Sequence, residues 1–243
     1  MPASLEVLTS LKDFPPTDWN RLAHGQRKPF DYREIAGPPE SFSEGPTHTS
    51  DPASGPPDSV PERDDSTPEP AESSREVPDN LSEEDERNPF ISHAFLNALE
   101  ESRSVGGRTG WSPLHLVIRD TAGRALGAMP AYGKSHSRGE YVFDHAFADA
   151  YTRAGGDYYP KLQVSVPFTP ATARKLLIAP EADAEATGDA LIAGLESLRA
   201  RIDGSSVHAT FLTRNDRDSF AAEGYLLRTD RQFHFTNRGY GNF

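Results

Sequence analysis

One stretch of this 243-residue chain, residues 38–88, constrains more than any other what the chain can fold into. It holds 15 acidic and three basic residues, and the resulting net charge of −12 equals that of the whole chain. Ten of the 21 prolines also lie there, whereas its larger aliphatic residues are only Val60, Val77 and Leu81. Such a stretch cannot bury enough apolar surface to offset the entropy lost on ordering. We therefore expect a long disordered acidic insertion, which we place at residues 29–87.

Outside residues 38–88 the chain is close to neutral, because it carries 22 acidic and 22 basic residues there. It has no basic stripe of the kind that indicates nucleic acid as a partner. The absence of cysteine excludes disulfides, a thiolate nucleophile and cysteine-ligated metals. The sequence shows neither a signal peptide nor a run of about 20 apolar residues. We expect a cytoplasmic protein with no membrane span and no bound metal.

The apolar pattern on either side of the insertion predicts alternating strands and helices. Ser92 is a natural N-cap, and Leu191, Leu195 and Leu198 recur at the spacing of one helix face. In chain order, the expected elements are a strand at 5–8, a short helix around residue 19, a helix at 93–102, strands at 114–118, 125–129 and 141–143, a helical turn at 145–153, strands at 162–166 and 176–178, a helix around 191–202, a strand at 207–212, a helix from 213 to 224, and strands at 225–227 and 232–235. This order predicts an α/β (α+β) protein with a mixed central sheet flanked by helices.

Six stretches outside the insertion resemble one bacterial family, described as peptidoglycan biosynthesis/recognition proteins that are FemAB-like and related to GNAT acyltransferases. The stretches are NPFISHAFLNALEES (88–102), GWSPLHLVI (110–118), GAMPAYGKSHSRGEYVFDHAFADAY (127–151), YYPKLQVSVPFTP (158–170), SSVHATFL (205–212) and QFHFTNRGY (232–240). The order of the expected elements is similar to that of the GNAT fold as well. The resemblance implies a GNAT-like, splayed central sheet that opens beside the strand at 162–166, where an acyl-CoA would lie.

The resemblance also implies how the chain is divided. Residues 1–28 would supply the first strand and helix of the GNAT-like domain, residues 29–87 the insertion, and residues 88–243 the main body. Family members resemble a tandem of two such domains, and we expect the second to be absent from this chain. The loop after the strand at 162–166 lacks the Gln/Arg-x-x-Gly-x-Gly/Ala pattern that binds pyrophosphate, and it has Ala173 where the family has glycine.

The function that the resemblance implies is N-acyl transfer. A base takes a proton from an amine acceptor, and the amine attacks the acyl group of acetyl-CoA, another acyl-CoA or an aminoacyl donor. The acceptor would be a small molecule or a peptidoglycan precursor. The missing glycine pattern leaves a second hypothesis open, a non-catalytic recognition module or pseudoenzyme whose acidic segment binds a protein partner. The sequence leaves undecided whether this chain alone is an enzyme.

The candidate site residues lie before and along the strand at 162–166. The densest group of titratable residues lies at 134–149 and includes Glu140. Because side chains alternate along a strand, Lys161 and Gln163 share one face and could reach one ligand. As catalytic residues we single out His145, Asp144 and Tyr159. For substrate binding we single out Lys134, His136, Tyr158, Lys161 and Gln163, and for cofactor binding Val164, Val166, Phe168, Thr169, Thr172 and Arg174.

Each of these sets also has a plain structural interpretation. The titratable residues are compatible with a solvated loop, and the tyrosines with the rim of a core. The loop after the strand is equally compatible with a solvated connection that binds no pyrophosphate.

Overall fold

A long antiparallel hairpin runs through the centre of the fold in the computed structural model, which describes residues 3–25, 88–142 and 144–229. One arm consists of β2 (Trp111–Pro113) and β3 (His115–Arg119), and the other of β4 (Ala125–Met129) and β5 (Ala131–Lys134). Both arms are interrupted at the same level. Pro130 has no N–H to give to the ladder, and the N–H of Ala131 donates to Nδ1 of His115. The hairpin is therefore shared between two sheets.

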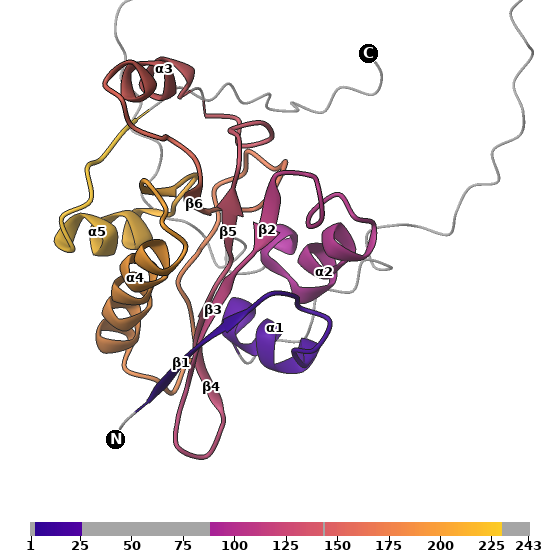
Figure 1. The fold of residues 1–243 in the computed structure, drawn as a ribbon. Coiled ribbons are helices and arrows are strands. Elements are labelled where there is room, and N and C mark those ends of the chain that lie inside the picture. Colours follow the sequence, from indigo (N-terminus) through magenta and orange to yellow (C-terminus); the bar gives the residue numbers. More distant parts are fainter. Residues whose placement is uncertain (1–2, 26–87, 143, 230–243) are drawn as a thin grey trace, which may run out of the picture. The chain divides into compact units, whose positions relative to one another are not determined.

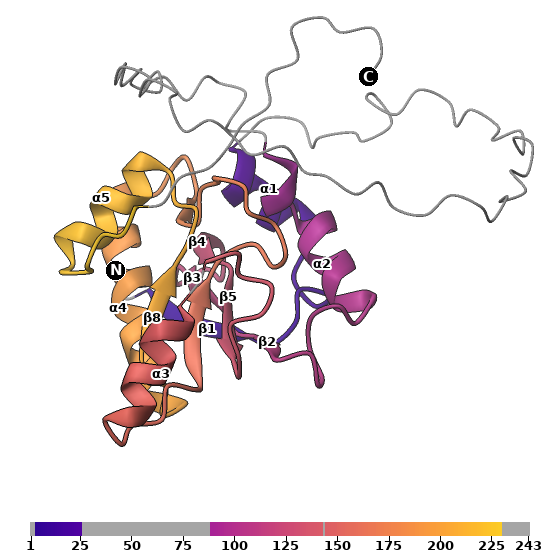
Figure 2. The ribbon, with the colours of Figure 1, turned by 90° about the horizontal axis from the view of Figure 1, so that it is seen from above.

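Each sheet has four strands. Figures 1 and 2 show the fold from two directions. Sheet A is antiparallel and has the order β1-β3-β4-β7, with β1 at Ser4–Leu8 and β7 at Leu177–Ile178. Sheet B has the order β2-β5-β6-β8, with β6 at Lys161–Val164 and β8 at Val207–Ala209. In sheet B, β6 is antiparallel to β5 and parallel to β8. This divided, mixed sheet confirms the expected α/β class.

Between β6 and β7 the chain leaves the sheet and returns to it. Both strands pair with the same arm of the hairpin, β6 with residues 131–134 and β7 with Gly127 and Ala128. The strands β6 and β7 therefore lie one after the other along the arm formed by β4 and β5. Residues 165–176, which connect the two strands, are called the excursion segment below.

Helices cover both faces of sheet A. The described helices are α1 (Pro16–His24), α2 (His93–Glu101), α3 (His145–Arg153), α4 (Ala184–Arg201) and α5 (Arg214–Ala222), with a 3₁₀ turn at Pro89–Ile91. Of these, α1 and α4 contact strands of sheet A. Val117 packs in a core with Trp19 of α1, whereas its neighbour Leu116 packs with Leu191 and Leu195 of α4. Because successive residues of a strand point to opposite faces, β3 separates the two cores. The helices α1 and α2 lie on one side of the hairpin and α4 on the other (Figure 1).

Most of the expected helices and strands are present, and the differences concern short strands. The strands at 162–166 and 207–212 end earlier than expected, at Val164 and Ala209. Residues 141–142 form no strand, because Tyr141 has a φ of 56°, which interrupts extended backbone. Residues 225–227 form none either, since no described segment pairs with them. Residue 143, the expected insertion and the expected strand at 232–235 lie outside the described residues.

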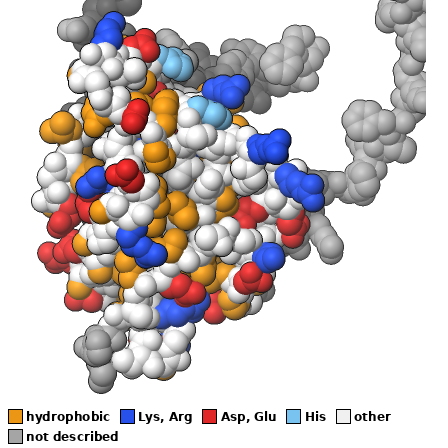
Figure 3. Space-filling view, in the orientation of Figure 1, with side chains coloured by type: hydrophobic (Ala, Val, Ile, Leu, Met, Phe, Trp, Pro, Cys, Tyr) orange, Lys and Arg blue, Asp and Glu red, His pale blue; other side chains and the backbone are white. Residues whose placement is uncertain are grey.

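All described residues belong to one unit, which comprises residues 1–29 and 82–243. The expected boundaries near residues 28 and 88 stay a prediction. On the face shown in Figure 3, acidic and basic side chains are interspersed with apolar ones, in keeping with the near-neutral composition outside the insertion. Among the described helices, none has the length and apolarity needed to cross a membrane.

The contact between β4 and α4 has no room for an additional methyl group. A Cβ on Gly127 would lie 2.6 Å from Cγ2 of Thr187 and 3.3 Å from Cδ1 of Leu191. Thr187 is β-branched and sits in a packed helix, so it cannot turn aside freely. We expect Gly127→Ala to lower the free energy of unfolding by about 1–3 kcal/mol in urea denaturation.

The matched control is Gly188→Ala on α4, where a new Cβ would meet its nearest neighbours at 3.7 and 3.8 Å. This change should leave stability unaltered or raise it by up to about 1 kcal/mol through helix propensity. Equal destabilisation by the two substitutions would contradict the close approach of β4 to α4.

Candidate functional site

One face of sheet B is apolar, and the other carries charged and polar side chains beside the rings of Trp111 and Tyr132. Leu162 and Val164 of β6 point toward the core formed with α4. Their neighbours Lys161 and Gln163 point the other way, and the pairing places Lys134 beside Lys161 and His208 beside Gln163. We call the side chains of Lys134, Lys161, Gln163 and His208 the polar face. Its residues come from three neighbouring strands, β5, β6 and β8.

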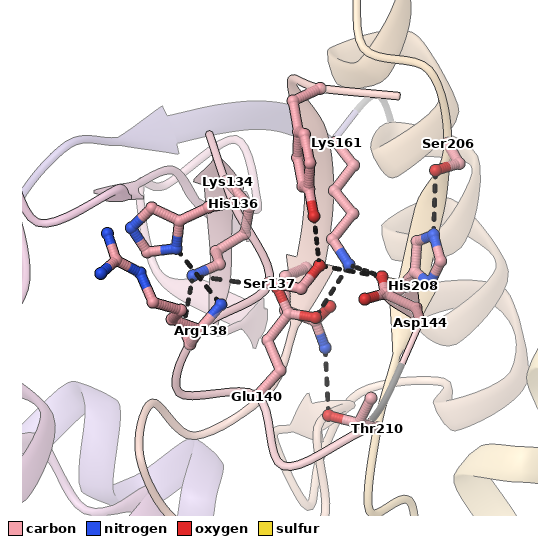
Figure 4. A network of polar contacts seen from close by, with 12 residues as sticks. Lys134, His136, Ser137, Arg138, Glu140, Asp144, Lys161, Ser206, His208 and Thr210 are labelled. Carbon is pink, nitrogen blue, oxygen red and sulfur yellow. Dashed lines mark hydrogen bonds and ion pairs between the residues drawn. The ribbon is translucent and has the colours of Figure 1, made fainter. Parts of the chain in front are cut away.

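A buried ion-pair network stands on the polar face. Nζ of Lys161 lies 2.8 Å from Oε2 of Glu140 and 2.5 Å from Oδ2 of Asp144. The three side chains are between 0% and 4% exposed. Glu140 and Asp144 belong to the loop that connects β5 to α3, so the network attaches this loop to the sheet (Figure 4). A buried charge is tolerated only when it is paired and hydrogen-bonded, as these charges are.

Asp144 is the most heavily bonded member of the network. Besides Lys161, Oδ2 accepts hydrogen bonds from Oγ of Ser137 at 2.9 Å and from the hydroxyl of Tyr158 at 2.8 Å. Burial alone would raise the pKa of Asp144, but the hydrogen bonds from Lys161, Ser137 and Tyr158 lower it to about 2. Burial and the bond to Asp144 raise the pKa of Tyr158. Asp144 is therefore ionised, and Tyr158 is a neutral donor, at every physiological pH.

Lys134 is held differently, against an aromatic ring. Its Nζ lies 3.4 Å from the ring centroid of Trp111, donates to the carbonyl of Arg138 at 3.1 Å and is 3.8 Å from Oε1 of Glu140. Burial lowers the pKa of Lys134 to about 8, an effect that Glu140 opposes. Burial raises the pKa of Glu140, which Lys161 opposes. The pKa of Lys134 is thus lowered, and that of Glu140 raised, toward neutral pH.

Several buried oxygens of this region make no hydrogen bond within the described part of the chain. They are Oε1 of Glu140, Oδ1 of Asp144, Oε1 of Gln163 and Oγ of Ser165. Buried polar groups in native proteins almost always have a partner, including water or a ligand. Three of the four atoms are obligate acceptors, so the group that would satisfy them is rich in hydrogen-bond donors.

A pocket of about 310 Å³ lies next to the network, on the loop that carries Glu140 and Asp144. Its lining residues are Ser137, Arg138, Gly139, Tyr141, Val142 and His145. The loop thus presents one set of side chains to the pocket and buries two carboxylates behind it.

The structure brings together most of the residues expected to bind substrate. Lys134, Tyr158, Lys161 and Gln163 all belong to the polar face or contact its network. His136 lies at its margin, where Nδ1 accepts from the N–H of Arg138. Burial, together with Lys134 and Arg138, lowers the pKa of His136.

The three residues expected to be catalytic are less closely grouped. Asp144 is in the network, whereas the hydroxyl of Tyr159 lies 2.7 Å from Oγ of Ser137. His145 is exposed at the start of α3 and lines the pocket. Sequence reasoning gave no role to Glu140 or to His208. Glu140 stood in the titratable group, but spacing alone does not reveal that its carboxylate turns inward.

His208 is a further polar-face residue whose role only the fold shows. Its Nε2 lies 2.9 Å from Oγ of Ser206 and 3.5 Å from the hydroxyl of Tyr158. Burial, with a smaller contribution from Lys161, lowers the pKa of His208 to about 4, so its imidazole is neutral at pH 7.

The residues expected to bind an acyl-CoA lie on β6 and in the excursion segment. Val164 and Val166 are buried in the core, and Phe168 is partly exposed. Oγ1 of Thr169 donates to the carbonyl of Pro167 within the same turn, while Thr172 is exposed and Arg174 half-buried. These side chains do not converge on a common point.

The opening expected beside β6 is bridged at two places by backbone hydrogen bonds within the chain. β6 pairs with β8 at all three register positions, and the N–H of Thr210 then donates to the carbonyl of Val164 at 3.0 Å. Beyond this point the N–H of Ala173 donates to the carbonyl of Phe211 at 3.1 Å. The excursion segment thus takes the place that the strand at 162–166 was expected to leave open.

The start of α4 does not suit a pyrophosphate either. The carboxylate of Asp183 accepts from the N–H of Ala186 at 3.1 Å, and Glu185 follows in the first turn. Glu181 precedes them and pairs with Arg21. Carboxylates at a helix N-terminus satisfy its donors and its dipole, so they compete with a bound phosphate. Nor do the described residues include a group of three or more His, Cys, Asp or Glu side chains that could hold a metal.

Asp144 should couple stability to acid pH. Its pKa is 3.8 ordinarily and about 2 in the folded chain, so its stabilisation is complete above pH 4 and is lost as the pH falls toward 2. Compared with Asp144→Asn, the wild type should lose about 2 kcal/mol of unfolding free energy over that interval, measured by urea denaturation. The exposed Asp149 on α3 supplies the control, since Asp149→Asn should leave the profile unaltered. A pH-independent difference between the wild type and Asp144→Asn would refute the assignment.

Lys134 should couple stability to alkaline pH. With a pKa of about 8 in the folded chain against 10.5 ordinarily, the unfolded chain holds the proton over this interval, so stability rises with pH from about 8 to 10.5. The unfolding free energy of the wild type should rise by about 3 kcal/mol relative to that of Lys134→Met over the same interval, measured by urea denaturation. Relative to Lys12→Met, the control at an exposed position, the wild type should show no such rise. A pH-independent difference between the wild type and Lys134→Met would mean that burial does not lower the pKa of Lys134.

Residues 72–243 match the model of a protein family described as FemAB-like, peptidoglycan biosynthesis/recognition. No curated protein matches the chain. Among solved structures, an aminoglycoside antibiotic 6′-N-acetyltransferase from Acinetobacter baumannii is similar at 17% identity over 58% of this chain and 79% of its own, with a TM-score of 0.33. A protein described as a probable acetyltransferase is similar at 12% identity over 64% and 81%, with a TM-score of 0.34. Because the family model covers more than half of the sequence, this chain belongs to the FemAB-like peptidoglycan biosynthesis/recognition family.

Proposed function

We propose that this domain holds the amine acceptor of an acyl or aminoacyl transfer related to peptidoglycan. One observation carries the proposal: Glu140 and Asp144 are buried side by side, and each keeps one oxygen without a hydrogen-bond partner among the described residues. The membership of the chain in the FemAB-like family supplies the reaction class. The specific acceptor we propose is a peptidoglycan peptide with a free side-chain amine.

A protonated amine is the group that complements these atoms best. It carries three donors, and the two carboxylates offer acceptors beyond those already engaged by Lys134 and Lys161. Lys161 already pairs with the other oxygen of each carboxylate, so it fixes both side chains in place. Gln163 adds an amide oxygen, because its Nε2 is engaged with Oγ1 of Thr210.

The amine must lose a proton before it attacks an acyl carbon. Asp144, with a pKa of about 2, is a weak base and serves to bind and orient. Glu140 has a raised pKa and is the better proton acceptor within the network. His145 at the edge of the pocket and Tyr159 beside Ser137 are the groups in this proposal through which a proton reaches solvent.

We propose the acyl donor only as a chemical class, an acyl-CoA or an aminoacyl donor. The residues expected to hold acyl-CoA do not converge, and carboxylates occupy the start of α4. These observations favour a second candidate function, a recognition module that binds the amine and transfers nothing itself. Binding of a protein partner by the acidic segment and a cytoplasmic location stay predictions.

A binding experiment with one peptide in two forms tests the acceptor proposal. A muropeptide with a free side-chain amine should bind about tenfold or more tightly than the same peptide N-acetylated at that amine, measured by calorimetry. Acetylation removes the positive charge and two of the donors while it keeps the rest of the ligand. Glu140→Gln should reduce the preference for the free amine, because it removes the negative charge of that carboxylate.

Glu185→Gln on α4 is the matched control and should leave the preference intact. Equal binding of the two peptides by the wild type would overturn the proposal. Incubation with an acyl or aminoacyl donor then separates the two candidate functions, since only the transferase converts the free amine into an amide.

A further inference from the structure

The excursion segment is attached to its surroundings along its length. The N–H of Phe168 donates to the carbonyl of Gly139 at 3.1 Å, and a Cβ on Gly139 would lie 2.5 Å from the Phe168 ring. Further on, Nδ2 of Asn88 donates to the carbonyl of Thr172 at 3.0 Å. Phe168 has a φ of 58°, an unfavourable value for a bulky residue, which persists where neighbouring contacts enforce it. These contacts distinguish the segment from an open loop.

Two buried charged residues clasp its far end. Nζ of Lys175 donates to the carbonyls of Ala173 at 2.9 Å and Phe211 at 3.1 Å. The carboxylate of Asp216 accepts from the N–H groups of Lys175 and, at 3.3 Å, Leu176. Lys175 is 0% exposed and Asp216 is 4% exposed. We call Lys175 and Asp216, with the backbone groups they bind, the clasp.

The clasp spans two elements that an incoming ligand would have to separate. Lys175 belongs to the excursion segment, whereas Asp216 lies in the first turn of α5, just after its N-cap Thr213. The bridge between Ala173 and Leu212 continues the parallel pairing that β6 and β8 begin. Removing one partner from a buried, hydrogen-bonded charged group leaves an unsatisfied charge, so opening the clasp is unfavourable.

The resemblance to GNAT acyltransferases implies an acyl-CoA between the strands that correspond to β6 and β8. In this chain that place holds the excursion segment, and the helix start beside it is capped by its own carboxylate. We propose that the excursion segment is a built-in occupant of the acyl-CoA position, held by the clasp, and that this domain binds no acyl-CoA there. The acyl donor must then reach the polar face from outside the β6–β8 pair. This inference is independent of which amine the polar face binds.

Two measurements on the wild-type protein test the proposal. Acetyl-CoA and coenzyme A should each leave the Tm unshifted in a thermal-shift titration, with an acetyl-CoA-dependent acetyltransferase run in parallel as a positive control. In hydrogen exchange, the amides of Ala173, Lys175 and Leu176 should be protected like those of β6. A saturable Tm shift with acetyl-CoA that also changes the exchange of these amides, or exchange of these amides in the free protein at the rate of an unstructured peptide, would overturn the proposal. A shift that leaves their exchange unchanged would place acetyl-CoA elsewhere on the domain.

A pair of variants on α5 tests the clasp itself. Asp216→Asn should accelerate exchange of the Lys175 and Leu176 amides about tenfold or more, because a neutral side chain is a weaker acceptor. Asp218→Asn, an exposed position on the same helix, should leave these amides unchanged. Identical exchange in the two variants would overturn the clasp. If Asp216→Asn does not fold, the wild-type measurements decide.

The outcome is separable from that of the acceptor proposal. Loss of the preference for a free amine bears on the polar face, whereas a change in the hydrogen exchange of Ala173, Lys175 and Leu176 on addition of acetyl-CoA bears on the excursion segment.

Discussion

The ion pairs of Lys161 with Glu140 and Asp144 hold together the part of the molecule in which we propose a function. The loop before α3 contributes both carboxylates, and α3 itself buries none of its nine residues. The hydrophobic effect therefore does little to attach this helix, and the polar network is what anchors the loop before it to sheet B. Taking charges out of water costs several kcal/mol per ion, so such a network persists only when nearly all of its members are satisfied. Here two carboxylate oxygens remain for a ligand or water.

The position of the network follows from the way the central hairpin is shared between two sheets. Pro130 interrupts one arm, and the ring of His115 takes the N–H that the ladder would have used. Nε2 of His115 in turn lies 3.1 Å from Oε1 of Glu100, which ties the interruption to α2. Beyond this level the strands of sheet B carry apolar side chains toward α4 and polar ones away from it. A single strand, β6, thus serves the core with one face and the candidate site with the other.

Sequence reasoning succeeded where the determining forces are local. The β3–β4 part of the hairpin, α4 with its leucine spacing and the shared face of Lys161 and Gln163 all follow from periodicity within a few residues. The strands β2 and β5 were not predicted. Sequence reasoning also failed at the ends of β6 and β8, because these depend on which segment lies alongside. Ala173, distant from β8 in sequence, takes up the pairing beyond Ala209, and no periodicity signals this. Glu140 was visible as a titratable residue, but its inward direction depends on Lys134 and Lys161 on two separate strands.

The amino-acid sequence by itself determined the α/β class, the order of most helices and strands, the family and the residues of the polar face on β6. These follow from alternation, helical spacing and local similarity, which act over short distances along the chain. Only the tertiary structure decided that two lysines and two carboxylates meet in one buried network and that residues 165–176 leave β6 and pair again beside Leu212. Both outcomes depend on the desolvation of charged groups by elements far apart in sequence. Burial is a property of the packed chain, so no local pattern contains it.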